Sequence, residues 1–448
     1  MDAVISYIVD LGPALMLPLI ILIVGLGFGH GFGPSLRSGI LVGIGFVGIG
    51  LVISLMTQNL GQATKAMAEH WGLGLKVIDL GWPGTSPMAW ASSVGFIAIP
   101  VAIAVNVVML LCRMTKVVNI DIWNIWHMAF TGAIVQVATD SYALAIATIA
   151  IHAAIAYKLG DIFTPVTDKY FGLEGIAMPH GTSAYCGVVA APVDDLIDKI
   201  PVIKDIKITS QSIEAKLQAF GQPVIIGAVL GSCIGFLASY TVVAALTLGV
   251  QMAAVMVLMP MVVKLIMQGL IPISETARKV LSKKFAKADF RIGLDCALML
   301  GDPAVVASSM IFVPLTLIIA ALMPGNEILP FGDLATIGFF VAIAVGVHGG
   351  NVFRVLISGT LIMSMTIWVA NQMSHLQQIL GQRVGLSKEG ELISSLDQSG
   401  CPITYLLTKG IKSEVGLGFF VILAFYLFCF FYSYMRYKKK TLGAKDLA

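Results

Sequence analysis

The sequence predicts an all-α, polytopic membrane protein. Hydrophobic residues make up 57% of the 448 residues and charged residues only 12%, against about 25% in soluble proteins. The mean hydropathy is +0.90, and the 46 glycines fit helices that pack closely in a membrane. No stretch between the apolar segments is long enough for a soluble domain of ordinary size. We therefore expect a single membrane-embedded domain over residues 1–448.

Apolar segments of about 17–25 residues are long enough to cross a bilayer as helices. The chain contains about eleven of them, near residues 13–29, 39–56, 93–112, 122–139, 141–157, 222–241, 243–267, 304–323, 334–350, 352–370 and 414–435. We therefore predict about eleven transmembrane helices. The N-terminal MDAVISYIVDLGP has no basic region and no small-residue cleavage site, so we interpret it as the start of a retained first span rather than a signal peptide.

The distribution of basic residues predicts the orientation of the chain. Lysine and arginine gather in segments 158–221 and 274–291 and in the tail 436–448, whereas the turns near 242 and 324–333 hold none. Because cytoplasmic loops carry the excess of positive charge, we expect the N-terminus outside and the C-terminus in the cytoplasm. The small net charge of +3 does not indicate a nucleic-acid partner. The six cysteines lack CxxC spacing, so we expect neither disulfides nor a metal site.

The order of the segments predicts an internal repeat. Two spans, a polar and broken insert and three further spans lead to a second broken insert, and this layout recurs displaced by about 210 residues. The first unit covers residues 13–192 and the second residues 222–406, with the final helix 414–435 outside both. Because each unit has an odd number of spans, the second lies inverted relative to the first. Inverted repeats with interrupted segments at matching positions are typical of secondary transporters.

One broken stretch, EGIAMPHGTSAYCG (Glu174 to Gly187), is the first candidate for a substrate site. Proline and glycine prevent a regular helix there, and its polar side chains are more than a lipid-facing segment tolerates. His180 and Thr182 can both donate and accept hydrogen bonds, and Glu174 accepts strongly or orients the other two. Its counterpart in the second unit is DQSGCPITYL (Asp397 to Leu406).

The other pair of broken inserts contributes an aromatic ring and a carboxylate. The first, DLGWPGTSPMAWASS, places Trp82 directly before a proline, where its ring can anchor the membrane interface or offer a face to a sugar. The second, IGLDCALMLGDPAVVASS, contains two aspartates in apolar sequence, where an ionised carboxylate is costly unless it is used. Asp302 precedes a proline and is either a helix N-cap or functional. Asp295 is the stronger candidate for accepting a hydrogen bond from a hydroxyl group of the ligand.

The fourth span, IWNIWHMAFTGAIVQVATDSY, holds further polar residues. His127 and Gln136 either bind neighbouring helices, as buried polar side chains in membranes often do, or contact a ligand. The chain contains no GxxxxGK[ST], HExxH or GxSxG motif, so nothing indicates ATP hydrolysis or covalent catalysis on this chain.

These segments closely resemble enzyme IIC, the membrane component of the galactitol branch of the bacterial phosphoenolpyruvate-dependent sugar phosphotransferase system. The resemblance runs from about Leu11 to Phe431 and rests on LVGIGFVGIGLVI, GWPGTSPMAWAS, VVNIDIWNIWHMAFTGA, EGIAMPHGTSAY, IGLDCALMLG, PGNEILPFGDLATIGFF and DQSGCPITYL. It implies inward transport of a sugar alcohol or sugar across the bacterial inner membrane. A separate phosphorylated enzyme IIB, itself supplied by enzyme IIA, would pass its phosphoryl group to the substrate, with no cofactor and no covalent phosphoryl intermediate on this chain.

The resemblance also implies an architecture and a set of site residues. The related ascorbate-type enzymes IIC are similar in architecture and form homodimers in which a mobile core carries the site past a scaffold, as in an elevator. By that analogy the expected substrate-binding residues are Trp82, Gln136, His180, Thr182 and Asp295, with His127 and Glu174 as further candidates. The alternative from another class is an ion-coupled symporter for a polar small molecule, which would use the same repeat and buried acids.

Overall fold

The computed structural model describes residues 13–27, 29–71, 74–119, 121–208, 222–285 and 290–443. The described helices are α2 (Pro13–Gly27), α3 (Phe32–Trp71), α4 (Trp82–Ala91), α5 (Ala98–Leu111), α6 (Ile125–Thr139), α7 (Tyr142–Lys169), α8 (Ser183–Gly187), α9 (Ala190–Ile197), α11 (Pro223–Leu237), α12 (Val242–Phe285), α13 (Pro303–Leu322), α14 (Gly338–Val347), α15 (Val352–Arg383), α16 (Pro402–Ile411) and α17 (Leu417–Gly443). Four short 3₁₀ segments, η1 (Ile122–Asn124), η2 (Ile203–Asp205), η3 (Cys296–Met299) and η4 (Gly332–Thr336), complete the helical elements.

The described part of the chain is mostly helical, and its composition is that of a multi-pass membrane protein. Six of its helices are long and apolar enough to cross a bilayer: Phe32–Leu60 within α3, Tyr142–Lys169, Val242–Ile266 within α12, Pro303–Leu322, Val352–Arg383 and Leu417–Lys438 within α17. Four shorter apolar stretches are Ala98–Leu111, Ile125–Thr139, Val224–Leu237 and Gly332–Val347. The expected helical membrane class is confirmed, while the count of eleven spans stays a prediction.

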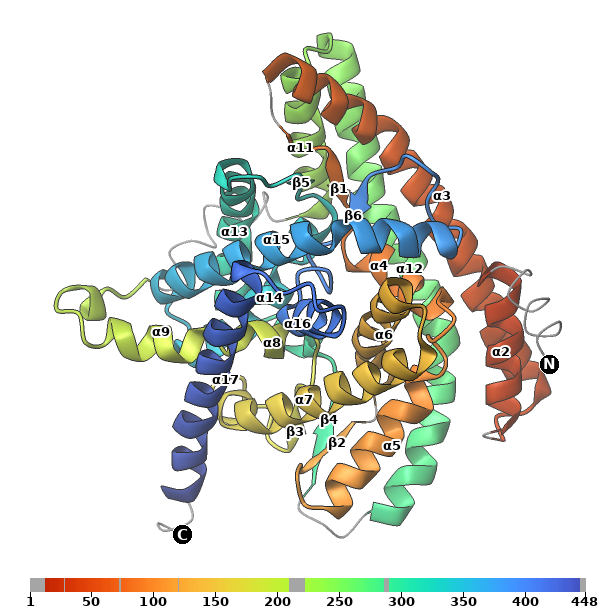
Figure 1. Cartoon of the computed structure of the whole chain (residues 1–448), viewed down its shortest axis with the longest axis vertical. Coiled ribbons are helices and arrows are strands. Elements are labelled where there is room, and N and C mark those ends of the chain that lie inside the picture. The colour runs from red at the N-terminus through yellow and green to blue at the C-terminus, as the bar shows by residue number, and fades with distance from the viewer. Residues whose placement is uncertain are drawn as a thin grey trace.

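Two helical hairpins form one side of the molecule. The pair α2–α3 and the pair α11–α12 pack against each other through α3 and α12. Figure 1 shows α2 and α3 at the right of the view and α11 at the top. Helices α14, α16 and α17 lie to the left of these hairpins in the same view, and α7 and α15 run across its middle (Figure 1). Both α3 and α12 continue well past the apolar segments predicted at 39–56 and 243–267, because the polar residues that follow support helix as well as loop.

Within the described residues, six very short strands, which the sequence did not predict, form two parallel sheets. The strands are β1 (Val77–Asp79), β2 (Val117–Asn119), β3 (Ile176–Ala177), β4 (Arg291–Gly293), β5 (Ile328–Leu329) and β6 (Ile393–Ser394). One sheet has the order β5-β1-β6 and the other β2-β4-β3. Each sheet therefore takes its central strand from one half of the chain and both flanking strands from the other. Strands of two or three residues are too short to produce a periodic hydrophobic pattern.

The registers bring the carboxyl ends of each sheet together. In the first sheet Ile78 pairs with Leu329 and with Ile393. In the second sheet Gly293 pairs with Asn119 and with Ala177. Because all of these pairings are parallel, the three segments that leave each sheet start at the same edge.

The final helix, predicted at 414–435, is α17 and continues to Gly443; residues 444–448 of the predicted tail lie outside the described residues. A network of ion pairs joins this helix to the rest of the protein. Asp194 of α9 accepts hydrogen bonds from His348 at 2.9 Å, Arg354 of α15 at 2.7 Å and Arg436 of α17 at 2.7 Å. Arg354 also reaches Asp198 at 2.6 Å.

Asp194 is the acceptor that holds this network together. Burial opposes ionisation of its carboxyl group, but the hydrogen bonds from His348, Arg436 and Arg354 outweigh that cost and hold its pKa well below the usual range. A depressed pKa contributes stability above the pKa of the unfolded chain, and that stability is lost as the pH falls towards the folded-state pKa.

Asp194→Asn should therefore destabilise the protein at pH 7 by about 3 kcal/mol, since it leaves two arginines without their shared carboxylate. The gap in melting temperature between wild type and variant should stay constant down to about pH 4 and narrow below it. Thermal unfolding in detergent across this pH range measures it, with the exposed Asp205→Asn as control. Equal stability of wild type and Asp194→Asn at pH 7 would contradict the assignment.

Candidate functional site

The candidate site lies where the carboxyl ends of both sheets meet. A cavity of about 210 Å³ is lined by residues that follow the strands: Trp82 after β1; Asp121, Trp123 and Trp126 after β2; His180 after β3; Asp295 and Ala297 after β4; Phe339 after β5; and Asp397 after β6. All six strands thus lead into it. In open α/β sheets, too, ligands bind outside the carboxyl ends of parallel strands.

Two fully buried carboxylates that do not line the cavity hold one of its walls in place. Asp79 accepts hydrogen bonds from the backbone N–H groups of Gly81 at 2.9 Å, Phe331 at 3.0 Å, Asp333 at 3.0 Å and Leu396 at 3.2 Å. This arrangement fastens the segments after β5 and β6 to the end of β1. Because each donor is a backbone group, the wall is fixed without using a side chain that a ligand needs.

Asp333 extends this framework to two residues that do line the cavity. One carboxylate oxygen accepts from the backbone N–H of Trp82 at 2.8 Å, and the other from the backbone N–H of Asp397 at 2.7 Å. Close approach at this point requires glycine, because a Cβ at Gly332 would lie 2.3 Å from the carbonyl group of Leu80. Trp82 and Asp397, which are far apart in the sequence, are therefore positioned by the same carboxylate.

The hydrogen bonds of His180 determine which of its ring nitrogens carries the proton. Nδ1 accepts from the backbone N–H groups of Thr182 at 3.2 Å and Ser183 at 3.3 Å. The neutral ring must then carry its proton on Nε2, which lies 3.8 Å from Oδ2 of Asp295. The ring stacks on Phe339 with centroids 5.3 Å apart. His180 consequently presents a hydrogen-bond donor beside an acceptor.

Asp295 is also an N-cap, a role that the sequence analysis assigned only to Asp302. Its Oδ1 accepts from the backbone N–H of Ala297 at 2.7 Å at the start of η3, while Oδ2 faces His180. Its own backbone N–H donates to Asp121 at 3.2 Å. Asp302 is the N-cap of α13, which was one of the two interpretations of this residue. Its carboxylate accepts hydrogen bonds from the backbone N–H groups of Ala304 and Val305. One oxygen of Asp295 thus stays available to a ligand.

Thr182 acts on the cavity through another residue. Its hydroxyl group donates to Oδ1 of Asp397, which also accepts from Gln398 at 3.1 Å. Asp397 lines the cavity and Thr182 does not. The contact joins the segment after β3 to the segment after β6, so the two broken inserts that the sequence paired do meet.

The three remaining predicted residues lie outside the cavity lining. His127 is fully buried behind His180, with ring centroids 4.5 Å apart, and a Cβ at Gly181 would collide with it at 2.3 Å. Gln136 lies further along α6 and accepts from Arg383 at 3.3 Å. Glu174 is exposed in the turn before β3. The structure therefore brings together Trp82, His180 and Asp295 from the predicted set, with Thr182 directly behind Asp397.

Six lining residues were not among the predicted ones: Asp121, Trp123, Trp126, Ala297, Phe339 and Asp397. Asp397 stands in an insert that the sequence did single out, and an acidic residue in apolar surroundings was the available signal. From the sequence alone, Trp123 and Trp126 are equally consistent with a position at the membrane interface and with a binding site.

A ring nitrogen of His180, a carboxylate oxygen of Asp295 and Sγ of Cys296 lie within 4.8 Å of one another, a spacing that suits a metal ion. The tautomer argues against this use. A neutral imidazole that binds a metal through Nε2 carries its proton on Nδ1, but Nδ1 of His180 already faces two N–H donors. In the second acidic cluster, Asp194 and Asp195 are engaged by Arg436 and Tyr432. We assign neither cluster to a metal.

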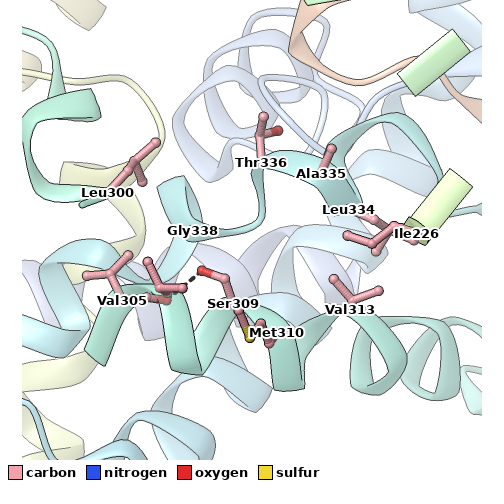
Figure 2. Close-up of a pocket in the computed structure, with 11 residues that line it drawn as sticks. Ile226, Leu300, Val305, Ser309, Met310, Val313, Leu334, Ala335, Thr336 and Gly338 are labelled. Atoms are coloured by element: carbon pink, nitrogen blue, oxygen red, sulfur yellow. Dashed lines mark hydrogen bonds between the residues drawn. The ribbon is translucent and has the colours of Figure 1, made fainter. Parts of the chain in front are cut away.

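A second cavity, of about 180 Å³, differs in chemistry. Figure 2 shows it between α13 and the η4–α14 segment, with Ile226 of α11 at one end. Its two hydroxyl groups bond back to the chain: Ser309 donates to the carbonyl of Val305 at 2.6 Å and Thr336 to that of Asp333 at 3.4 Å. The other lining groups are apolar, so this cavity has few hydrogen-bonding groups for a polar ligand.

Comparisons with known proteins match nearly the whole chain. Residues 7–385 match the EIIC-GAT family, described as a "PTS system sugar-specific permease component". The chain is 54% identical over 433 residues to the "PTS system galactitol-specific EIIC component" of Escherichia coli (strain K12), covering 97% of this chain and 96% of the relative. It is 37% identical over 415 residues to a "Putative permease IIC component" of the same strain, covering 92% and 95%.

Proposed function

The chain belongs to the family of sugar-specific permease components of the phosphotransferase system, as its motifs indicated, and from this premise we propose that it carries galactitol or a related sugar alcohol across the bacterial inner membrane. A separate enzyme IIB, supplied by enzyme IIA, would phosphorylate the substrate. The relatives' names support the substrate class. The cavity at the six strand ends is the observation that carries the proposal.

The cavity has the groups that a polyol needs. A sugar alcohol has only hydroxyl groups, each of which donates one hydrogen bond and accepts others. Oδ2 of Asp295 and Asp397 can accept from them, and Nε2–H of His180 can donate. Trp82 also lines the cavity, so its ring can pack on the C–H groups of the substrate.

The arrangement of elements supports an inverted repeat and an elevator mechanism. The element order α2, α3, β1, β2, β3 is repeated as α11, α12, β4, β5, β6, and each sheet exchanges strands between the halves. An exchange of this kind is what a two-fold relation between the halves would produce. The α2–α3 and α11–α12 hairpins would form the scaffold, and the elements around the cavity the mobile core. By resemblance to ascorbate-type enzymes IIC we include a homodimer, which a mass measurement in nanodiscs checks.

The direction of transport follows from the charge at the site. Phosphorylation adds about two negative charges to the substrate, and three carboxylates line the cavity. Repulsion would then favour release of the product on the side where the phosphoryl donor acts. We place that side, together with the C-terminus and the basic segments, in the cytoplasm. The chain would carry the substrate without forming a covalent phosphoryl intermediate itself.

Galactitol should bind to the purified full-length protein, and two variants should weaken it. His180→Ala removes a donor and should lower the affinity about tenfold or more. Trp82→Ala removes the ring that packs on the substrate, so it should lower the affinity about threefold to tenfold. Isothermal titration measures both, with Glu174→Gln as an exposed control outside the cavity. Wild-type affinity in both variants would show that the cavity is not the sugar site.

The energy source separates this proposal from an ion-coupled symporter. Uptake of labelled galactitol into membrane vesicles should require phosphoenolpyruvate and the soluble phosphotransfer proteins, and the sugar should accumulate as its phosphate. An uncoupler should leave the rate unchanged, because no ion gradient drives the step. Uptake that an uncoupler stops, and that proceeds without phosphoenolpyruvate, would point to the symporter instead.

The elevator mechanism predicts that a covalent link between scaffold and core stops transport. Helix α4, which leads from the cavity wall, packs on α3 and α12. A disulfide between introduced cysteines on α3 and α4 should stop uptake but leave galactitol binding intact, and reduction should restore uptake. A disulfide within the α2–α3 hairpin is the control. Unimpaired uptake across the α3–α4 link would mean that these elements do not move relative to each other.

A further inference from the structure

The cavity is acidic and has no basic side chain to balance it. Asp121, Asp295 and Asp397 all contribute to its lining, and none of the described lysines or arginines lines it or pairs with these three residues. The histidine beside Asp295 carries only the proton that its neutral tautomer requires. Buried carboxylates that have no cation nearby repel one another, and their desolvation costs free energy.

Two of the carboxylates keep an oxygen for a ligand. Asp295 uses Oδ1 as an N-cap, and its Oδ2 lies 3.8 Å from Nε2 of His180, which is longer than a hydrogen bond. Asp397 receives Thr182 and Gln398 on Oδ1, while Oδ2 has no donor among the described residues. Asp121 is engaged on both oxygens by backbone N–H groups.

The walls between these carboxylates are aromatic. Trp82, Trp123, Trp126 and Phe339 line the cavity. Trp82 and Trp123 meet edge to face with centroids 5.8 Å apart, so their rings face different directions. The faces of tryptophan rings attract cations, including the ammonium groups of ligands. This second feature is independent of the carboxylates and favours the same ligand charge.

From these two features we propose that the cavity binds amino-polyols, in which a protonated amine replaces one hydroxyl group of a sugar alcohol, more tightly than it binds the neutral sugar alcohol. The inference deepens the proposed function, since it concerns the same site. The ammonium group lies against Oδ2 of Asp295 or Asp397 and beside the tryptophan rings. The remaining hydroxyl groups use the same donors and acceptors as those of the neutral substrate.

The same charges exclude anionic sugars. A carboxylate in place of a terminal hydroxymethyl group would face Asp295 and Asp397 without a cation within the described lining. Three ligands of nearly equal size that differ in one terminal substituent should therefore differ in affinity. The ligand with the ammonium group binds most tightly, the one with the hydroxyl group less tightly and the one with the carboxylate least.

Three probes test the order on the full-length protein in nanodiscs. Isothermal titration at pH 7 compares galactitol, 1-amino-1-deoxygalactitol and galactonate, and competition with labelled galactitol shows whether they share a site. The amine should bind about tenfold more tightly than galactitol, and galactonate should not compete. Galactitol binding with an amine that binds equally or more weakly would overturn the inference and leave the proposed function standing. No galactitol binding at all would instead overturn the proposed function.

Charge-neutralising variants locate the ammonium group. Asp295→Asn and Asp397→Asn keep the shape of the side chain, and at least one of them should abolish most of the amine's advantage over galactitol. The ratio of the two affinities is the readout, because a general disturbance of the site would lower both affinities together. Glu174→Gln removes an exposed carboxylate near β3 and should leave the ratio unchanged. A ratio that stays at the wild-type value in both aspartate variants would contradict the role of these carboxylates.

Discussion

The carboxylate of Asp79 accepts four backbone hydrogen bonds from three segments of the chain that are far apart in sequence. Buried backbone N–H groups need hydrogen-bond acceptors, and Asp79 provides them for the segments that leave β1, β5 and β6. Asp333 repeats the arrangement one step closer to the cavity. The placement of Trp82 and Asp397 depends on this pair of buried acids.

The short sheets solve the same problem by pairing the two halves of the chain. Each sheet closes its backbone hydrogen bonds by placing one strand between two from the other half, so neither half can complete a sheet alone. The broken inserts that follow the strands are thereby forced towards a common point. A site built this way has walls that belong to both halves, which suits a carrier whose ligand sits between two related units.

The helical membrane class could be predicted from composition, because long apolar segments report directly on the bilayer. His180 and Asp295 could be found because a polar residue in an apolar, broken segment is costly unless it is used. The sequence does not distinguish Trp123 and Phe339 in this way, because aromatic residues are common in membrane segments without any role in binding. Their places are set by strand pairing between residues more than a hundred positions apart, in strands too short to leave a pattern. The same limit explains why Gln136 and Glu174, which lie outside the cavity lining, carry the same polar signal in the sequence as His180.

The carboxylates around the cavity differ in how many donors the protein supplies, and this difference indicates what the ligand must bring. Asp79 has four backbone donors and needs none. Asp397 has two on one oxygen, and Asp295 has one N-cap donor and a distant histidine. A buried acceptor without a hydrogen-bond donor costs free energy, and a ligand that donates a hydrogen bond removes this cost. The ligand that relieves this cost is therefore rich in donors and small enough to lie between tryptophan rings, and a sugar alcohol meets both conditions with its hydroxyl groups alone.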